Sequence, residues 1–499
     1  MPIIHWFRRD FRLYDNTALW HAAGDAPDGI IPVFIFDDDI LRHPDTGGPI
    51  VQFMLQCLAE LRDSLRRAGG DLVLRHGRPA EELLELARAG HASAVYFNKD
   101  YAPGAIERDA CVQRLLQRDG IAVRAFKDQV IFEEREVLAE SSGRPFTVFG
   151  PYRRAWQKRF DEIAADGGLR VAPRPRLRFP AALRTLRSID LPQAADLGFS
   201  VAQTFEIDAG EQAARRMLRQ FCAGPIRRYA QMRNLPAIVD GTSRLSPHLR
   251  HGTISPRQCI AAALEARREG GAAFREGVDG WLAELIWREF FQQILFNFPR
   301  VEHEPFKAIW HRLKFPSDER AFERWWRGTS GVPIVDAAMR QLNATGWMHN
   351  RLRMIVAMFL TRDLLLDYRL GERYFMRNLI DGETAQNNGN WQWSAGCGTD
   401  AQPWFRIFNP VAQARRFDPD GAFVRRWCPE LARVPVEFIH EPHLMSADAQ
   451  RTARCRIPGD YPAPMVDHGQ ARRRALEFFG SLRRSAQSQR PPESTDGLR

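Results

Sequence analysis

The sequence lacks the signals of a membrane or exported protein. Its 499 residues contain no apolar run of about 18, the length that a membrane-spanning helix needs. The opening segment, Met1–Asp10, has no long apolar core of the kind found in signal peptides. We therefore expect a cytoplasmic protein with no membrane partner.

Cysteine is scarce and scattered. The 7 cysteines are odd in number and never stand in C-x-x-C spacing: Cys57, Cys111, Cys222, Cys259, Cys397, Cys428 and Cys455. This pattern favours reduced thiols and gives no local support for a metal site. A site made by the last three would have no close ligand pair, which metal sites usually have. We expect neither a metal ion nor a metal cluster.

Several fingerprints of catalysis are also missing. No G-x-G-x-x-G follows an expected strand, so a dinucleotide is not expected to bind by that loop. G-x-S-x-G, H-E-x-x-H and G-x-x-x-x-G-K-[ST] are absent, which removes support for hydrolase and P-loop chemistry. Histidines such as His248, His251 and His349 are more often structural than catalytic. Any chemistry therefore belongs to a bound cofactor.

Positive charge and tryptophan are present in excess. The net charge of +10 suits a polyanionic partner, nucleic acid before an anionic membrane, although an Arg-rich composition alone gives the same value. The 13 tryptophans add to the case, because indoles stack on bases and line redox or flavin sites.

The first part of the chain alternates short apolar runs with helical patterns. Helical spacing covers Val51–Ala68 and Ala80–Ala89. The expected strands are Ile3–Phe7, Ile30–Phe36, Asp71–Arg75, Ala94–Asn98 and Ile121–Phe126. This alternation predicts a doubly wound, Rossmann-like parallel sheet with helices on both faces, over residues 1–130.

The remainder divides into three regions. Residues 131–204 are irregular, with a Pro- and Arg-rich stretch at 170–176, and are expected to be an interdomain linker. Residues 205–475 predict an all-α domain, and the polar residues 476–499 a disordered tail. The clearest helical patterns are Trp281–Phe298, Ile334–Thr345 and Met348–Leu366.

Two stretches of the helical region combine polar and aromatic residues. In G-T-S-R-L-S-P, residues 241–247, hydroxyl groups and an Arg precede a helix with Pro at its expected first position, a suitable arrangement for a phosphate. Taken by itself, the motif is explained better by an ordinary helix cap with a solvated Arg than by a phosphate site. The second stretch is Trp281–Phe290, in which Glu284, Trp287 and Arg288 share one face of an expected helix. This face fits a binding site and, equally well, a surface Glu–Arg ion pair beside a core Trp.

The third stretch, D-G-E-T-A-Q-N-N-G-N-W-Q-W at 381–393, is rich in side-chain amides. Adjacent amides and glycines make a poor helix interior, so we expect a loop. Such a loop suits a planar polar ligand, because amides pair with its edge and indoles stack on it. Here the sequence favours a binding site.

These motifs occur in an order that resembles the photolyase/cryptochrome family, and within it the photolyases of cyclobutane pyrimidine dimers (CPDs). W-F-R-R-D-F-R-L at 6–13, the three stretches above, G-W-M-H-N-R-L-R-M at 346–354 and G-T-D-A-Q-P-W-F-R-I-F-N-P at 398–410 carry the resemblance. It spans residues 3 to about 475. It implies an N-terminal domain for an antenna pigment and a helical domain that binds FAD.

The resemblance also implies flavin contacts, position by position. The phosphates and their linker would meet Tyr229, Thr242, Ser243, Arg244, Leu245 and Ser246. The ribityl chain and the isoalloxazine edge would meet Trp281, Glu284, Arg288, Asn350, Arg353, Asp381 and Glu383. The family usually has Asp in place of Glu383. Asn387 falls opposite flavin N5, where photolyases have Asn, plant cryptochromes tend to have Asp and animal cryptochromes Cys.

The implied substrate is UV-damaged DNA, with the dimer flipped out of the duplex and split by an electron from light-excited FADH⁻. Glu284 would bond the carbonyl edge of the dimer, and Trp287 and Trp393 would pack against its rings. Asn350 and Met354 match CPD photolyases, whereas (6-4) photolyases carry His. The implied contacts to the DNA backbone are Arg233, Arg351, Trp404, Arg406 and Gln413.

One part of the family pattern is missing. Photoreduction of oxidised FAD usually runs through three tryptophans, and here Trp391 is followed by Tyr368 and, in a loose alignment, Phe315. We expect slow photoreduction or another route, through Trp310 or Trp347.

The antenna pigment, methenyltetrahydrofolate or 8-hydroxy-deazaflavin, is left open, since Glu107 does not decide it. We expect a monomer.

Four other functions remain as alternatives to CPD repair. They are a cryptochrome photoreceptor, a DASH-type enzyme for single-stranded DNA, a light-independent flavoprotein and a DNA-binding module.

Overall fold

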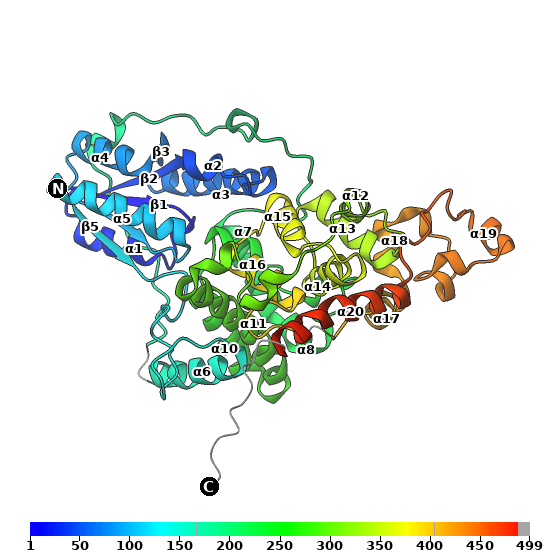
Figure 1. The fold of residues 1–499 in the computed structure, drawn as a ribbon. Coiled ribbons are helices and arrows are strands. Elements are labelled where there is room, and N and C mark those ends of the chain that lie inside the picture. Colours follow the sequence, from blue (N-terminus) through cyan, green and yellow to red (C-terminus); the bar gives the residue numbers. More distant parts are fainter. Residues whose placement is uncertain (166–167, 404, 488–499) are drawn as a thin grey trace, which may run out of the picture.

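The computed structural model describes residues 1–165, 168–403 and 405–487. It consists of an N-terminal α/β part followed by a larger helical part (Figure 1). Within the described residues, no helix is long and apolar enough to cross a membrane. The α/β architecture of the first part and the helical architecture of the second confirm the predicted fold class.

The α/β part is built on five parallel strands in the order β3-β2-β1-β4-β5. The strands are β1 (Ile3–Phe7), β2 (Ile30–Asp37), β3 (Val73–Gly77), β4 (Ala94–Asn98) and β5 (Ala122–Phe126). The chain starts in the middle of the sheet and winds towards each edge in turn, as a doubly wound sheet does. All five strands were predicted, with small differences at the ends of three.

Helices cover both faces of this sheet, because successive side chains of a strand point to opposite sides. Ile3 joins one apolar cluster and Ile4 the other. The first cluster includes Leu58 and the second Leu116, which belong to helices on opposite faces. The helices of this part are α1 (Thr17–Asp25), α2 (Asp38–Leu41), α3 (Gly48–Arg67), α4 (Pro79–Ala89) and α5 (Pro103–Arg118).

Residues 131–204 were predicted to be irregular, and this is wrong for α6 (Phe149–Ala165). Tyr152, Trp156 and Phe160 recur every four residues and are buried, so α6 is an amphipathic helix that packs against the helical part. The later residues form only the short turns η1 (Ala181–Arg184) and η2 (Ala195–Leu197) within the described part of this region. The role of the region as a linker stays a prediction.

The helical part is arranged around α11, which lies among α6, α8, α10 and α16 (Figure 1). Its first helices are α7 (Glu211–Ala223), η3 (Pro225–Arg228), α8 (Tyr229–Met232), η4 (Val239–Gly241), α9 (Ser246–His251), α10 (Pro256–Gly270), α11 (Ala272–Asn297), η5 (Pro299–Glu302) and η6 (Ala308–Arg312). The next are α12 (Glu319–Trp326), α13 (Pro333–Thr345), α14 (Asn350–Met358), η7 (Phe359–Asp363), α15 (Tyr368–Asn378) and α16 (Thr384–Ala395). The last are α17 (Pro410–Phe417), α18 (Ala422–Trp427), η8 (Pro429–Leu431), η9 (Val436–Phe438), η10 (Pro442–Leu444), α19 (Ala447–Ala453) and α20 (His468–Gln487).

Two predictions in this part need correction. The expected single helix Met348–Leu366 is divided, because α14 passes into the π-helical turn η7. The tail was predicted to be disordered from 476, but α20 is helical to Gln487, and its Phe479 is buried against Trp310, with ring centroids 5.2 Å apart. The rest of that prediction, 488–499, lies outside the described residues.

Candidate functional site

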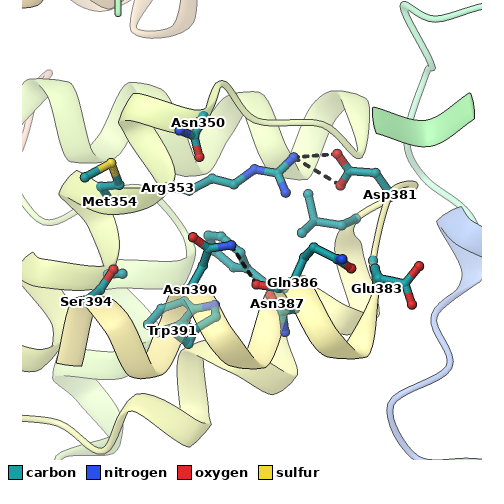
Figure 2. A pocket seen from close by; sticks show the side chains of 14 residues that line it. Asn350, Arg353, Met354, Asp381, Glu383, Gln386, Asn387, Asn390, Trp391 and Ser394 are labelled. Atoms are coloured by element: carbon teal, nitrogen blue, oxygen red, sulfur yellow. Dashed lines mark hydrogen bonds and ion pairs between the residues drawn. The ribbon is translucent and has the colours of Figure 1, made fainter. Parts of the chain in front are cut away.

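The main cavity of the helical part has a volume of about 410 Å³ and is lined from α8, α9, α11, α14 and α16. A smaller cavity of about 80 Å³ lies between α14 and α16 and shares Asn350, Arg353 and Met354 with it (Figure 2). The larger volume is in the range of cofactor sites. Here the chain has room for a sizeable organic ligand.

The structure brings together every residue that the sequence assigned to the flavin or to the lesion. The main cavity is lined by Tyr229, Thr242, Ser243, Arg244, Leu245, Ser246, Trp281, Glu284, Trp287, Arg288, Asn350, Arg353, Met354, Asp381, Glu383 and Trp393. Asn387 and Trp391 line the smaller one. One continuous site therefore holds both predicted sets, and their individual roles stay proposals.

The segment between η4 and α9 contributes Thr242–Ser246 to the cavity wall. Ser243 Oγ accepts a hydrogen bond from Trp281 Nε1 at 3.2 Å, which fixes the hydroxyl beside the indole. Arg244 is not the solvated cap residue of the alternative interpretation. Its side chain is 15% exposed, pairs with Glu206 at 3.0 Å and lies over the Trp347 ring.

Helix α11 presents Glu284, Trp287 and Arg288 to the main cavity, as their spacing predicted. Arg233 Nη1 lies 2.7 Å from the Glu284 carboxylate. Burial raises the pKa of Glu284 and the charge of Arg233 opposes the rise, with a net upward shift. Burial lowers the pKa of Arg288 to about 10, so this guanidinium stays charged at neutral pH.

The amide-rich stretch was predicted to be a loop, and this is wrong, because it forms α16. Its amides bond to backbone groups outside the helix: Asn388 Nδ2 donates to Val301 O at 2.8 Å, and Gln392 Nε2 to Val301 O at 2.9 Å. A side chain at Gly389 would place its Cβ within 2.2 Å of the Phe291 ring. Tertiary contacts with α11 and η5 therefore outweigh the low helix propensity of these residues.

Arg353 and Asp381 form a two-bonded ion pair at the junction of the cavities (Figure 2). Arg353 Nη2 lies 3.0 and 2.8 Å from the two Asp381 oxygens, and Arg353 Nε donates to Met348 O at 2.9 Å. Asn387 Nδ2 donates to Glu372 O at 2.9 Å, which fixes the orientation of the amide in the smaller cavity. The polar groups of this wall are thus held before any ligand binds.

Glu383 points away from Arg353 (Figure 2) and its carboxylate pairs with Arg9, which follows β1 in the α/β part. Arg9 also lies 3.2 Å from Asp100, and Arg250 lies 4.0 Å from Glu383. Burial raises the pKa of Asp100, but the surrounding guanidinium groups outweigh it and hold this pKa well below its usual range. The Arg9–Glu383 ion pair therefore joins the two parts of the chain beside the cavity.

The sequence did not identify Arg9 or Arg250. Arg9 stands in the W-F-R-R-D motif, which carried the resemblance but received no role. Arg250 follows G-T-S-R-L-S-P by less than one helical turn, lines the cavity and donates to Gly382 O at 2.6 Å. Arg250 could have been found from its position just after the G-T-S-R-L-S-P motif. Arg9 could have been found as the second arginine of W-F-R-R-D, to which the sequence gave no role.

Of the residues predicted to contact DNA, Arg233 and Arg351 line the main cavity. Arg406 is exposed and Gln413 half-buried, and Trp404 lies outside the described residues. Burial lowers the pKa of Arg351, and the charges of Arg233, Arg416 and Arg406 lower it further. Arg416, which the sequence did not identify, therefore belongs to the same positively charged region.

The three residues predicted for electron transfer belong to one apolar cluster, in which Trp391 and Tyr368 are buried and against which Phe315 packs. The Trp391 ring packs against Phe375 at 5.0 Å and Trp325 at 6.2 Å between centroids, and Trp325 was not predicted. Tyr368 is buried at the start of α15, and Phe315 packs against Phe478 and Phe479. Of the two tryptophans proposed as another route, Trp310 packs on Phe479 and Trp347 lines the main cavity.

The polar groups of the cavity fit a flavin dinucleotide. Arg244 Nε and Gln386 Oε1 are buried side-chain atoms of the lining with no hydrogen-bond partner among the described residues. Such atoms are costly unless a ligand pairs with them. Among the described residues, no three His, Cys, Asp or Glu side chains gather as metal ligands, and the 7 cysteines are free.

Comparisons with known proteins show the family to which the chain belongs. Residues 3–175 match the family described as DNA photolyase, and residues 281–481 the FAD binding domain of DNA photolyase. The deoxyribodipyrimidine photo-lyase of Halobacterium salinarum is 41% identical over 491 residues, which cover 96% of this chain and 99% of that protein.

Two solved structures extend the similarity to the fold. A class III photolyase of Agrobacterium tumefaciens superposes with a TM-score of 0.87 at 36% identity, over 97% of this chain and 98% of that one. A cryptochrome of Synechocystis gives 0.84 at 26% identity, over 96% of this chain and 99% of that one. By its sequence matches over nearly its whole length, the chain belongs to the DNA photolyase family.

Proposed function

We propose that this chain is a light-dependent DNA repair enzyme that uses reduced FAD to split cyclobutane pyrimidine dimers. The observation that carries the proposal is that the predicted flavin residues and the predicted lesion residues line one continuous site. A flipped-out dimer and the cofactor would then be in contact, which electron transfer between them requires.

The residues that would hold FAD divide into two groups. The hydroxyls and guanidinium of Thr242–Ser246 would bind its phosphates, and the Arg353–Asp381 pair and Asn387 would meet the isoalloxazine edge. When bound, reduced FAD supplies the electron that light excitation makes available. The chain contributes fixed polar groups in a largely buried site, where they act more strongly than in water.

Glu284, Trp287 and Trp393 would receive the dimer. A Glu284 carboxyl that carries a proton would donate to a dimer carbonyl and stabilise the negative charge that develops there. Trp287 and Trp393 would pack on the two rings. Asn350 and Met354 would favour the CPD over the (6-4) lesion.

Repair by this route would consume no net reductant, because the electron that reduced FAD would supply to the dimer would return to the flavin once the dimer is split. Photoreduction of oxidised FAD is a separate reaction. We expect it to be slow through Trp391, Tyr368 and Phe315, because two of the three usual tryptophans are replaced. Trp325, the tryptophan whose ring packs against Trp391, is now the first candidate for another route.

The surface around the site suits the DNA backbone. Arg233, Arg351, Arg406 and Gln413, with Trp404, would contact phosphates, and the net charge of +10 would favour the encounter. We further propose that residues 1–130 hold an antenna pigment, folate or deazaflavin in type, and that the protein acts as a monomer.

The test is repair of an oligonucleotide with one defined thymine dimer by the purified, chemically reduced protein. We expect ultraviolet absorbance of the strand to recover under blue light and not in darkness. Bound FAD that responds to light without any recovery would instead support a photoreceptor, the function suggested by the cryptochrome-like fold.

A further inference from the structure

The segment that the sequence assigned to a linker is attached along one stripe of α11. Glu289, Gln293 and Asn297, spaced four residues apart, bond to it in turn. Glu289 accepts from Ile131 N at 2.7 Å, Gln293 Nε2 donates to Phe146 O at 2.9 Å, and Asn297 Nδ2 donates to Glu134 O at 3.2 Å.

The attachment continues into α6. Trp156 Nε1 donates to Glu289 at 2.7 Å, and Tyr152 and Phe290 pack ring against ring at 5.3 Å. Three consecutive turns of α11 therefore fix the position of this segment next to the cavity wall. A linker that only spans two domains needs no such series of buried and part-buried hydrogen bonds.

The first residue of α6 meets the predicted lesion site. Phe149 stacks on Trp287 with ring centroids 3.6 Å apart and an angle of 8° between the rings. Phe149 is 8% exposed and is not among the described residues that line either cavity. Trp287 is half-buried and lines the main cavity. Phe290 and Phe291 also contact this indole, with ring centroids at 5.5 and 5.4 Å, so the Phe149 stack is the closest of three ring contacts that hold a side chain lining the cavity.

We propose that Phe149 is a positioning residue that holds Trp287 in the orientation needed to receive the dimer. The inference rests on the proposed function and deepens it, since it adds residues 131–165 to the lesion-recognition machinery. Parallel stacking limits rotation of the indole about its side-chain bonds, so less order has to be imposed when a dimer binds. Without Phe149, Trp287 would keep its contacts with Phe290 and Phe291 but lose its closest ring contact, the parallel stack that limits its rotation most.

The same helix supplies a matched control. Phe160 stacks on Trp156 with the same angle of 8° and a centroid distance of 5.0 Å, and both residues are buried. Neither is among the described residues that line a cavity. Phe160→Ala therefore removes the same atoms from the same kind of pair without touching Trp287.

The experiment measures the affinity of the flavin-loaded protein for a dimer-containing and for an undamaged oligonucleotide, in darkness. We expect Phe149→Ala to weaken binding of the dimer about tenfold, while binding of undamaged DNA changes less than about twofold. Phe149→Leu, which keeps apolar volume without a ring, gives a second folded variant with the same expected loss. Phe149→Tyr should restore wild-type binding.

The outcomes separate this inference from the proposed function. Wild-type protein that binds both oligonucleotides equally overturns the proposed dimer site, and this inference with it. Wild-type preference that survives in Phe149→Ala, or falls equally in Phe160→Ala, overturns the role of Phe149 alone. FAD content and the flavin spectrum, which Phe149→Ala should leave unchanged, report separately on the cofactor site.

Discussion

Two walls of the same cavity are built in different ways. The α11 wall carries Glu284, Trp287 and Arg288 on a helix whose spacing is visible in the sequence. The α16 wall carries Gln386 and Asn390 on a helix that local preference opposes. The helical spacing of side chains in the sequence is enough to predict the first wall. The second wall is helical because its amides form hydrogen bonds to backbone groups far away in the chain. Substitutions of the residues that α11 presents to the cavity should therefore act on chemistry, and substitutions of the buried amides that anchor α16 should act on stability.

The largest expected effect is at Glu284 in the α11 wall. Glu284→Ala should lower the repair rate by about 100-fold or more, because it removes the donor to the dimer carbonyl. Glu284→Gln keeps a donor and should retain most of the activity, while unfolding free energy stays similar in both. Rates from single-turnover repair would decide, and equal activity of Ala and Gln would contradict a protonated Glu284.

The next effect concerns Arg9, which pairs with Glu383 at the start of the α16 wall. Arg9→Met should reduce the free energy of unfolding by about 3 kcal/mol, since it leaves the buried carboxylates of Glu383 and Asp100 with less compensation. Arg9→Met with Glu383→Gln should recover part of the loss. Arg42→Met, at a side chain that is 81% exposed, is the control and should change little. Urea unfolding measures all three.

Gln392 should have a somewhat smaller effect. It donates to Val301 O and Glu304 O, at 2.9 and 3.0 Å, and accepts from Phe306 N at 2.8 Å. Gln392→Ala removes the partner of Glu304 O and Phe306 N and one of the two donors to Val301 O, and should lower the free energy of unfolding by about 2 kcal/mol. Asn390→Ala, on the exposed side of α16, should cost less than about 0.5 kcal/mol. Similar losses in both variants would contradict a wall held by tertiary hydrogen bonds.

The smallest expected effect depends on pH. Burial raises the pKa of Glu372 from 4.5 to about 7, although a hydrogen bond from Asn388 opposes the rise. The folded protein then holds this proton more tightly than the unfolded chain, so the stabilisation is complete below pH 4.5 and is lost as pH rises through 7. The Glu372 carboxyl should by itself make stability at about pH 8 about 1–2 kcal/mol lower than at about pH 6.

Glu372→Gln should flatten that part of the pH dependence, because an amide does not titrate. Glu437→Gln, at an exposed position, should leave it unchanged. Urea midpoints across the pH range give the comparison. An unchanged slope in Glu372→Gln would assign the pH dependence to other groups.

Sequence patterns were sufficient where local rules decide the structure. Alternating apolar runs gave all five strands, and the spacing of Glu284, Trp287 and Arg288 gave their common face. They failed where distant partners decide. The helix at 384–395 depends on Val301 and Phe291, and α6 was overlooked inside a region rich in Arg and Pro.

The candidate site was predicted by resemblance more than by pattern. The flavin and lesion residues came together as the family motifs implied, whereas Arg9 and Phe149 lie in segments to which the sequence gave no part in the site, and both contact residues of the site. Trp325 could not be foreseen either, because its contact with Trp391 joins residues far apart in the chain.

The pairing of Arg9 with Glu383 bears on attempts to recombine members of this family. A chimera that takes its α/β unit from another protein would keep this contact only if the donor supplies a guanidinium at the same place. The residues at positions 9 and 383 would therefore have to be exchanged together, because each is the ion-pair partner of the other across the two parts of the chain.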